Sequence, residues 1–270
     1  MKDGSEEVVH AGGLRWNVAV TGPDEGPPAL LLHGFPEQWR SWRKQIAPFT
    51  AAGMRVFAAD LPGYAGTDAP ADYSLETLAG HVTGLAEHVG DGAVHLVGHD
   101  WGGIVAHAVA ALHPETVRSL VVASAPHPDV MSRALRDPRQ IAKSWYVGLF
   151  LIPGIEYVVG SGVIVDRIFA GASAGVHDRE DMKRALAYYR ANLAPWQLNK
   201  EPLGRIAAPG LLVHGGRDPY IGAALMEATC DVFDDLRGFE VLDGAHYIHR
   251  EKPDDFNRAV IAFWRALDAV

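Results

Sequence analysis

Six residues, 98–103, constrain the fold of this chain more than any other segment. They read Gly-His-Asp-Trp-Gly-Gly, which is the spacing of a nucleophile elbow, a sharp turn from a strand into a helix that raises one side chain above a sheet. Glycine has no Cβ, so the flanking glycines allow strained backbone angles and a close approach of helix and strand. An apolar run at 93–97 precedes the turn and an Ala/Val-rich run at 104–112 follows it. The segment therefore predicts a buried strand, a tight turn and a helix.

The residue at the tip of this turn is Asp100 rather than a serine. A carboxylate cannot act as the nucleophile of a serine esterase, but it can attack a saturated carbon and form an alkyl-ester intermediate. The alternative is that Asp100 is an incidental N-cap of the following helix.

Apolar runs bounded by Gly, Pro or Asp alternate with helical patterns along much of the chain. Continuous apolar runs suit a parallel sheet that is covered on both faces, and their alternation with helices indicates a doubly wound α/β fold. The clearest helical patterns lie at 75–89, 104–112 and 254–267, the last beginning after Pro253. We predict an edge hairpin of residues 8–10 and 14–20, and buried strands at 28–32, 54–59, 93–97, 119–123, 210–213 and 239–242.

The sheet pattern stops after residue 127 and resumes near residue 209. The intervening segment carries helical, aromatic-rich patterns and turn signals such as Ile152-Pro153-Gly154. We therefore predict a core domain formed by residues 1–127 and 205–270, with a helical cap, residues 128–204, inserted between two strands.

The composition suits one large α/β domain with such an insertion, because the chain has 270 residues, of which 48% are hydrophobic and 21% charged. The net charge of −9 argues against a nucleic-acid or anionic-membrane partner. Cys230 is the only cysteine, which excludes an intrachain disulfide and a zinc–thiolate cluster. No apolar stretch approaches the ~18 residues of a membrane span and no signal region is recognisable, so we expect a soluble, cytoplasmic protein.

Four chemically reactive segments follow predicted strands, where open α/β sheets place their chemistry. They are His33-Gly34-Phe35-Pro36-Glu37, the elbow at Asp100, the segment ending in Asp218, and the turn that contains His246. We predict that Asp100 is the nucleophile and that His246 is the general base that activates water. Asp218 is expected to fix the tautomer of His246 and to stabilise its imidazolium form.

Each assignment has an alternative. Asp218 could merely cap a turn, and its rival as the acid is Asp129. His99 adjoins Asp100, but neighbouring side chains on a turn usually diverge, so we do not expect His99 to be the base. His249 is expected to face solvent or to support the site. Backbone N–H groups of Phe35 and Trp101 are candidates for an oxyanion hole, where the loss of one donor typically costs ~100- to 1000-fold in rate.

From about residue 8 to its C-terminus, the chain resembles the α/β-hydrolase superfamily, in particular its epoxide hydrolases and the related haloalkane dehalogenases. His33-Gly34-Phe35-Pro36 is similar to their HGxP oxyanion motif, and residues 98–103 are similar to the elbow that both families share. The order of nucleophile, acid and histidine also agrees. The resemblance implies an α/β-hydrolase fold with a mostly parallel eight-stranded sheet, an inserted cap and an Asp-His-Asp triad that needs neither cofactor nor metal.

In epoxide hydrolases two cap tyrosines hydrogen-bond the epoxide oxygen. Tyr146 stands before a Pro-Gly turn at the spacing of that family, and Tyr189 matches the tyrosine before Arg in the second cap motif. Tyr188 is the alternative to Tyr189, because one step along a helix rotates a side chain by about 100°. Aromatic residues in a cap can also simply pack. Residues expected to contact the substrate are Phe35, Trp101, Tyr188 and Trp145, and further candidates, with core packing as the alternative, are Phe150, Phe169 and Trp196.

A haloalkane dehalogenase remains the second hypothesis, because a halide ion needs N–H donors in an apolar pocket. Trp101 resembles the halide-holding tryptophan of dehalogenases, and Trp145 or Trp196 could supply a second donor. However, Phe35 stands where many dehalogenases have Asn. Fluoroacetate dehalogenases carry Arg where this chain has Trp101 and Ile104, so carboxylate-bearing substrates are disfavoured.

Our leading hypothesis is a cofactor-independent epoxide hydrolase that acts on a small apolar epoxide and water, as a monomer or a homodimer. The third hypothesis is a non-catalytic binding protein of the same fold. The intact set of nucleophile, acid and base argues against it, because a binding module needs none of these groups.

Overall fold

The computed structural model describes residues 5–90, 92–160, 178–194 and 201–268. Its centre is an eight-stranded sheet in the order β1-β2-β4-β3-β5-β6-β7-β8. The pairs β1–β2 and β2–β4 are antiparallel and the others are parallel, which confirms the predicted mostly parallel sheet with an antiparallel hairpin at one edge. The strands are β1 (Ser5–Ala11), β2 (Leu14–Thr21), β3 (Pro28–Leu32), β4 (Arg55–Ala59), β5 (Val94–His99), β6 (Val117–Ala123), β7 (Gly210–Gly215) and β8 (Leu236–Leu242).

Helices cover both faces of the sheet, so the central strands are buried on both sides. On β3, Leu30 and Leu32 belong to one buried cluster, and Ala29 and Leu31 belong to the other. This division follows from the alternation of side chains along a strand, and it explains why β3 is apolar throughout. One face carries α2 (Leu75–Val89), α3 (Trp101–Leu112) and α10 (Ala223–Cys230), and the other carries α1 (Arg43–Ala51), α11 (Ile248–Glu251) and α12 (Pro253–Asp268).

The element boundaries agree with the sequence patterns except where glycines or polar residues stand at an end. Helix α2 spans the predicted 75–89, and the side chain of Ser74 caps it by accepting from the N–H of Thr77. Helix α3 begins at Trp101 rather than at residue 104, because the two glycines after the elbow belong to its first turn. Strand β6 begins at Val117 rather than at residue 119, and β8 begins at Leu236 rather than at residue 239. In both strands the pairing extends beyond the most apolar residues.

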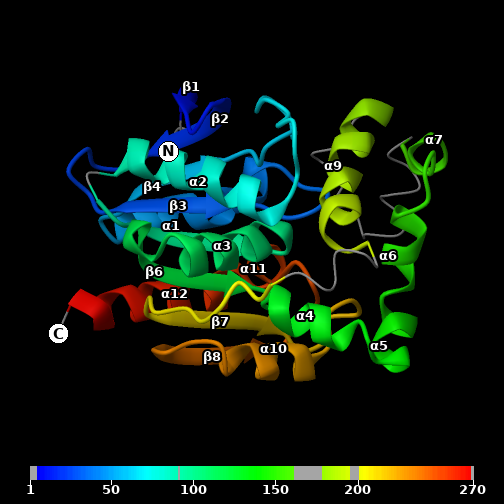
Figure 1. The fold of residues 1–270 in the computed structure, drawn as a ribbon. Coiled ribbons are helices and arrows are strands. Elements are labelled where there is room, and N and C mark those ends of the chain that lie inside the picture. The colour runs from blue at the N-terminus through cyan, green and yellow to red at the C-terminus, as the bar shows by residue number, and fades with distance from the viewer. Residues whose placement is uncertain (1–4, 91, 161–177, 195–200, 269–270) are drawn as a thin grey trace.

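Between β6 and β7 the chain forms a group of helices, and Figure 1 shows three of them (α6, α7 and α9) standing together at one end of the sheet. The bounds 128–204 of the cap domain stay a prediction. Among the described residues, no helix is long and apolar enough to cross a membrane. The helices of this segment are α4 (Pro128–Ala134), α5 (Pro138–Lys143), α6 (Trp145–Phe150), α7 (Glu156–Val159) and α9 (Arg179–Asn192).

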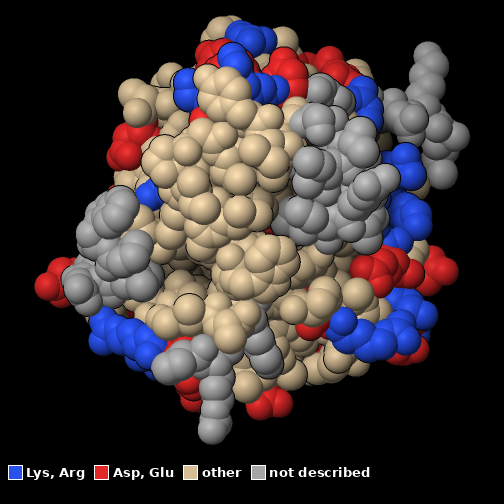
Figure 2. Space-filling model, turned by 90° about the vertical axis from the view of Figure 1, so that its right-hand side faces the viewer, with Lys and Arg blue, Asp and Glu red and all other residues tan. Residues whose placement is uncertain are grey.

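The surface on the cap side is shown in Figure 2, where uncharged side chains occupy the middle and charged side chains lie mainly around the edge. Several large apolar side chains of α6, α7 and the turn between them are exposed, namely Trp145, Ile152, Tyr157 and Val158.

Side-chain hydrogen bonds fasten α9 to the core. The hydroxyl of Tyr188 donates to the Pro62 carbonyl at 2.8 Å. The side chain of Asn192 donates to the Tyr73 carbonyl at 2.8 Å and accepts from the N–H of Leu75 at 3.0 Å. Helix α9 therefore has a fixed position over the carboxyl ends of the strands.

Arg190 joins α9 to the helices beside it. Its guanidinium donates to the carbonyls of Phe150 and Ile152 at 3.2 and 3.0 Å, and to the Glu156 carboxylate at 2.7 Å. Since Phe150 ends α6 and Glu156 begins α7, one side chain connects three helices of the cap.

The elbow requires glycine for a steric reason, and this gives a stability prediction. A Cβ at Gly102 would lie well inside van der Waals distance of the Leu32 and His33 carbonyls. We expect Gly102→Ala to lower the free energy of unfolding by about 1–3 kcal/mol, because helix and strand must move apart. Denaturant unfolding measures this change.

The matched control is Gly80→Ala in the exposed part of α2, where an added Cβ meets no neighbouring atom within 4 Å. Here alanine should raise the free energy of unfolding by about 0.5–1 kcal/mol, because it restricts the unfolded chain. Equal effects of the two substitutions would contradict the steric explanation.

Candidate active site

The elbow places Asp100 in a strained backbone conformation between β5 and α3. Its φ is +49° and its ψ is −121°, a region that residues other than glycine rarely occupy. Such strain costs about 1–3 kcal/mol and persists only where the surroundings enforce it. The N–H of Asp100 donates to the Ala123 carbonyl at 3.2 Å, and the Ile104 N–H donates to the Asp100 carbonyl at 2.9 Å. The turn thereby holds the carboxylate at the carboxyl ends of the central strands.

The structure brings together the three residues that we predict to form the triad. Nδ1 of His246 donates to Oδ2 of Asp218 at 2.8 Å, and Nε2 of His246 lies 3.4 Å from Oδ2 of Asp100. The other oxygen of Asp218 accepts from the N–H groups of Tyr220 and Ile221 at 2.8 and 3.0 Å. Asp218 therefore caps its own turn and also orients the histidine, so the two interpretations of this residue are compatible.

The rival acid, Asp129, has different partners. Its carboxylate accepts from the N–H groups of Leu203 and Gly204 at 3.1 and 3.3 Å, and it lies 3.7 Å from Nδ1 of His127. Asp129 thus fastens the start of α4 to the segment that returns to the core, while Asp218 holds His246.

Two carboxylates stabilise the charged form of His246. Burial alone would lower the pKa of this imidazole, but Asp218 and Asp100 outweigh it and raise the pKa to about 10. The Asp218 carboxyl is also buried, which raises its pKa, but the contact with His246 prevails and lowers the pKa overall. The carboxyl groups on either side of His246 therefore favour the imidazolium form of this residue.

One backbone donor of the predicted oxyanion hole contacts the nucleophile directly. The N–H of Phe35 donates to Oδ1 of Asp100 at 2.7 Å. The two oxygens of Asp100 thus differ, because Oδ1 is held by a backbone N–H and Oδ2 faces His246. Trp101 is the first residue of α3, and the role of its N–H as a second donor stays a prediction.

The two cap tyrosines come close to the triad from different helices. The ring of Tyr189 lies 5.3 Å from that of Phe35 and 5.0 Å from that of Trp101. The ring of Tyr146 lies 5.5 Å from that of Tyr220, which in turn lies 5.2 Å from His246.

Both phenols keep their protons. Burial, followed by the charge of Asp100, raises the pKa of Tyr146 and of Tyr189 far above neutrality. Each phenol can therefore act as a hydrogen-bond donor, and its contact with a substrate oxygen stays a prediction.

Two of the expected substrate contacts are corrected by the structure. Tyr188 is turned toward the core, since its hydroxyl is bonded to Pro62 and its ring packs against Tyr64 and Tyr73. Trp145 is 61% exposed on the outer surface of α6. In both cases the helix rotation directs the neighbouring residue, Tyr189 or Tyr146, toward the site instead.

Of the further candidates for the pocket, Phe150 is buried with its ring 5.4 Å from Phe35 and 5.0 Å from Tyr189. It therefore belongs to an aromatic cluster with Phe35 and Tyr189. Phe169 and Trp196 lie outside the described residues.

A buried polar network beneath the triad was not expected from the sequence. Arg250 donates to Glu37 at 3.1 Å, Nδ1 of His99 lies 3.0 Å from a Glu37 carboxylate oxygen, and Nε2 of His99 lies 3.0 Å from the backbone carbonyl oxygen of His246. His99 thus diverges from Asp100, as expected, and supports the backbone of the base. The sequence signals for this network were Glu37, directly after the HGxP motif, and His99 in the elbow. Neither signal indicates that the two side chains contact each other.

His249 packs against this network and is buried rather than exposed to solvent. Its ring lies 4.3 Å from that of Trp42 and 4.5 Å from that of His99. Within the described part of the chain, Glu37, His99 and His249 bring potential metal-ligating atoms within 4.8 Å of one another. Glu37 and His99 already have Arg250 and the His246 carbonyl as partners, so we interpret these two as members of a hydrogen-bond network and His249 as an imidazole that packs beside them.

This fold and constellation define an α/β-hydrolase. Residues 27–194, more than half of the chain, match the model of the alpha/beta hydrolase fold family, and the chain belongs to that family. It is 31% identical to epoxide hydrolase 4 of Homo sapiens, over 93% of this chain and 76% of the human protein. It is also 31% identical to the AB hydrolase superfamily protein YfhM of Bacillus subtilis, over 95% and 96% of the two chains.

Among solved structures, an epoxide hydrolase from metagenomes of hot environments superposes with a TM-score of 0.84 at 26% identity, over 97% of this chain and 99% of the other. The chain is thus an epoxide hydrolase-like α/β-hydrolase.

The charge of Asp100 should be visible in the titration of His246. We predict that Asp100→Asn lowers the pKa of His246 below the value of about 10, because the imidazolium loses one of its two neighbouring negative charges. NMR titration of the imidazole measures the shift, with the resonance assigned by its loss in His246→Gln and the amide verified by intact mass.

Asp68→Asn is the control, because this carboxylate pairs with Arg15 at the surface. It should leave the titration unchanged. An unchanged titration in Asp100→Asn as well would show that Asp100 does not stabilise the imidazolium.

Proposed function

We propose that this protein is an epoxide hydrolase that opens a small apolar epoxide to a vicinal diol through an ester of Asp100. The observation that supports this most is the combination of one carboxylate, Asp100, with two buried cap phenols, Tyr146 beside Tyr220 and Tyr189 beside Phe35. Ring opening needs both, because a carbon must be attacked while the departing oxygen is stabilised as an alkoxide.

In the first step Asp100 attacks a ring carbon. We assign the attack to Oδ2, because Oδ1 is held by the Phe35 N–H at 2.7 Å. A bond forms between Oδ2 and the carbon, the carbon–oxygen bond of the epoxide breaks, and the oxygen receives hydrogen bonds and then a proton from the phenols. The product of this step is a hydroxyalkyl ester of Asp100.

Formation of the ester changes the charge balance around His246. The esterified Asp100 is neutral, so it no longer supports the imidazolium and the pKa of His246 falls. The imidazolium gives up its proton to restore the phenol that protonated the alkoxide. The imidazole that remains is neutral and can act as a general base.

In the second step His246 removes a proton from water, and the hydroxide attacks the ester carbonyl of Asp100. The N–H of Phe35 is positioned to stabilise the resulting oxyanion, and Trp101 is the candidate for the second donor. Collapse of the intermediate releases the diol and regenerates both the carboxylate and the imidazolium. The sum of the two steps is the addition of water to the epoxide.

A haloalkane dehalogenase would use the same carboxylate and histidine, and the tryptophan next to the nucleophile favours it as a second candidate. Trp101 is buried beside the site, but Trp145 is exposed and not placed to hold a halide. Incubation with an aryl epoxide and with a bromoalkane distinguishes the two activities. Diol formation supports the epoxide hydrolase, and halide release without diol formation would refute it.

The two-step mechanism predicts a trapped intermediate. His246→Gln should still form the ester but hydrolyse it poorly, so that alkylated protein accumulates and is detected by intact-protein mass spectrometry. Asp100→Ala should form no adduct. Normal turnover by His246→Gln would show that another group is the base.

The cap tyrosines give a prediction with a built-in control. We expect the double variant Tyr146→Phe/Tyr189→Phe to slow ring opening by about 100-fold or more in single-turnover experiments, because the alkoxide loses both proton donors. Tyr188→Phe should change this rate only a few-fold, because its hydroxyl is bonded to Pro62. Equal effects of Tyr188→Phe and Tyr189→Phe would contradict the assignment.

A further inference from the structure

The proposed general base is carried by a connection that has no regular structure of its own. The chain between β8 and α11 contains His246 but no helix or strand. A strand ladder therefore does not fix this backbone, and side chains contribute to holding it. The Glu251 carboxylate accepts from the N–H groups of Ala245 and Tyr247 at 2.7 and 3.1 Å. The carbonyl oxygen of His246 itself lies 3.0 Å from Nε2 of His99.

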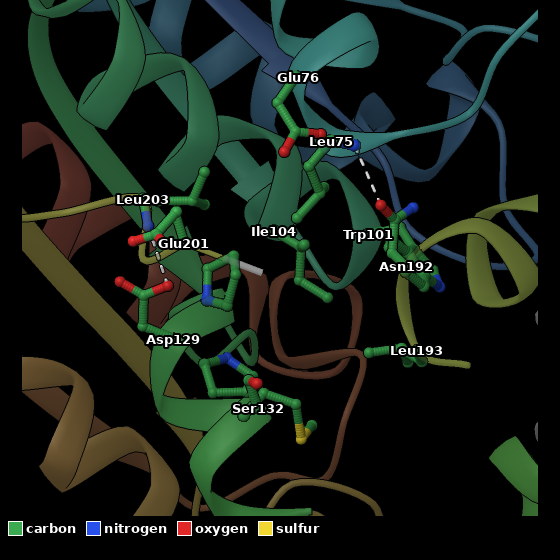
Figure 3. Close-up of a pocket in the computed structure, with 13 residues that line it drawn as sticks. Leu75, Glu76, Trp101, Ile104, Asp129, Ser132, Asn192, Leu193, Glu201 and Leu203 are labelled. Carbon is green, nitrogen blue, oxygen red and sulfur yellow. Dashed lines mark hydrogen bonds between the residues drawn. The ribbon is translucent and has the colours of Figure 1, made fainter. Parts of the chain in front are cut away.

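The contact with His99 comes from the residue directly before the proposed nucleophile. His99 is the last residue of the central strand β5, and its side chain is fully buried. The residue after Asp100, Trp101, lines a cavity between the start of α2, helices α3 and α4, and the residues that follow α9 (Figure 3). Two consecutive residues of the elbow thus face His246: Asp100 lies 3.4 Å from its ring, and His99 contacts its backbone.

Glu37 fixes the orientation of the His99 ring. Its Oε2 lies 3.0 Å from Nδ1 of His99, and its Oε1 accepts from Arg250 at 3.1 Å. Glu37 is itself buried, and the guanidinium of Arg250 supplies the opposite charge that a buried carboxylate requires. A carboxylate and a carbonyl are both hydrogen-bond acceptors, so each ring nitrogen of His99 faces an acceptor. Rotation of the ring would therefore break both contacts at once.

We propose that His99, oriented by Glu37, is a positioning residue that holds His246 at its distance from Asp100 and serves hydrolysis of the ester rather than its formation. This inference rests on the proposed two-step reaction and adds to it the residues that place the base. Attack on the epoxide is made by Asp100 with the cap phenols. Removal of a proton from water, in contrast, requires the imidazole at the correct distance from the ester carbonyl, and a misplacement of about 1 Å can cost about 100-fold in rate.

The first test separates the two steps in a single turnover. In His99→Gln the new side chain cannot reach both acceptors, because its donor hydrogens share one nitrogen. We expect ester hydrolysis to slow by about 10- to 100-fold and ester formation to change by no more than about three-fold, so that alkylated protein accumulates. Rapid quenching followed by intact-protein mass spectrometry measures both rates. An unchanged hydrolysis rate, or equal slowing of both steps, would overturn the assignment.

His95→Gln is the matched control. His95 lies in the same strand, is also buried, and has its Nδ1 2.8 Å from the hydroxyl oxygen of Ser119. Both substitutions remove a buried imidazole, so both should lower the midpoint of denaturant unfolding. Only His99→Gln should lower the ratio of the hydrolysis rate to the rate of ester formation. A fall of this ratio in both variants would show that lost stability, and not the position of the base, causes it.

A double-mutant cycle tests whether Glu37 acts through His99. If it does, Glu37→Gln/His99→Gln slows hydrolysis no more than His99→Gln alone. Additive effects would show that Glu37 acts on the reaction by another route. Arg250→Gln, at a half-buried position, changes the same network from the surface, should the buried substitutions prevent folding. It should lower the ratio of the two rates in the same direction, and an unchanged ratio there would contradict the proposal.

The last measurement needs no substrate. Burial lowers the pKa of His246, and the two carboxylates raise it to about 10 at their observed distances. NMR titration should therefore show a lower pKa of His246 in His99→Gln and an unchanged pKa in His95→Gln. If the pKa does not respond while the unaltered protein forms diol, the positioning role is wrong and the proposed activity stands. If the pKa responds but no epoxide yields diol, the proposed activity fails, and the link to ester hydrolysis fails with it.

Discussion

The site depends on one buried imidazole that is held between two carboxylates. His246 bonds to Asp218 at 2.8 Å and faces Asp100 at 3.4 Å. These residues come from three segments that follow different strands, so the order of the parallel sheet is what allows them to meet. A charged group this deeply buried is stable only when it is paired, and removal of one partner from such a pair typically costs about 3–5 kcal/mol. In the mechanism that we propose, the same pairing links charge to chemistry, because esterification of Asp100 lowers the pKa of His246 and lets the imidazole act as a base.

The cap contributes the two tyrosines that we propose as proton donors, Tyr146 and Tyr189. Two adjacent tyrosines on α9 have different tasks because they point about 100° apart on the helix. Tyr188 anchors the helix to the Pro62 carbonyl, and Tyr189 packs against Phe35 and Trp101 beside Asp100. The hydrogen bonds of Asn192 and Arg190 hold the same helix on both sides. In the reaction that we propose, a phenol must lie within hydrogen-bond distance of the epoxide oxygen, and these hydrogen bonds hold α9 in one position for that role.

Much of the fold and the nucleophile, base and acid candidates could be predicted from local patterns. The strands are short apolar runs between turn residues, and the elbow has a spacing that few other turns require. Sequence alone could not decide between Tyr188 and Tyr189, because their orientation depends on how α9 docks against Pro62 and Tyr73. It also placed Trp145 at the substrate, although the chain turns this side chain to solvent. The Glu37–His99 contact joins residues that are far apart in the chain, and no periodicity encodes such a pair. The start of α3 was placed three residues too late because glycine counts against a helix except where close packing demands it.

Isotopic labelling of Asp100 is the most direct test of covalent catalysis by this carboxylate. Unlabelled protein is given less than one equivalent of an epoxide in heavy-oxygen water, and both the diol and the peptide that contains Asp100 are analysed by mass spectrometry. Attack of water on the ester carbonyl requires that the heavy oxygen enters the Asp100 side chain and that the diol of this first turnover contains none. If the heavy oxygen is found in the diol and never in Asp100, water attacks the epoxide directly and Asp100 is not the nucleophile.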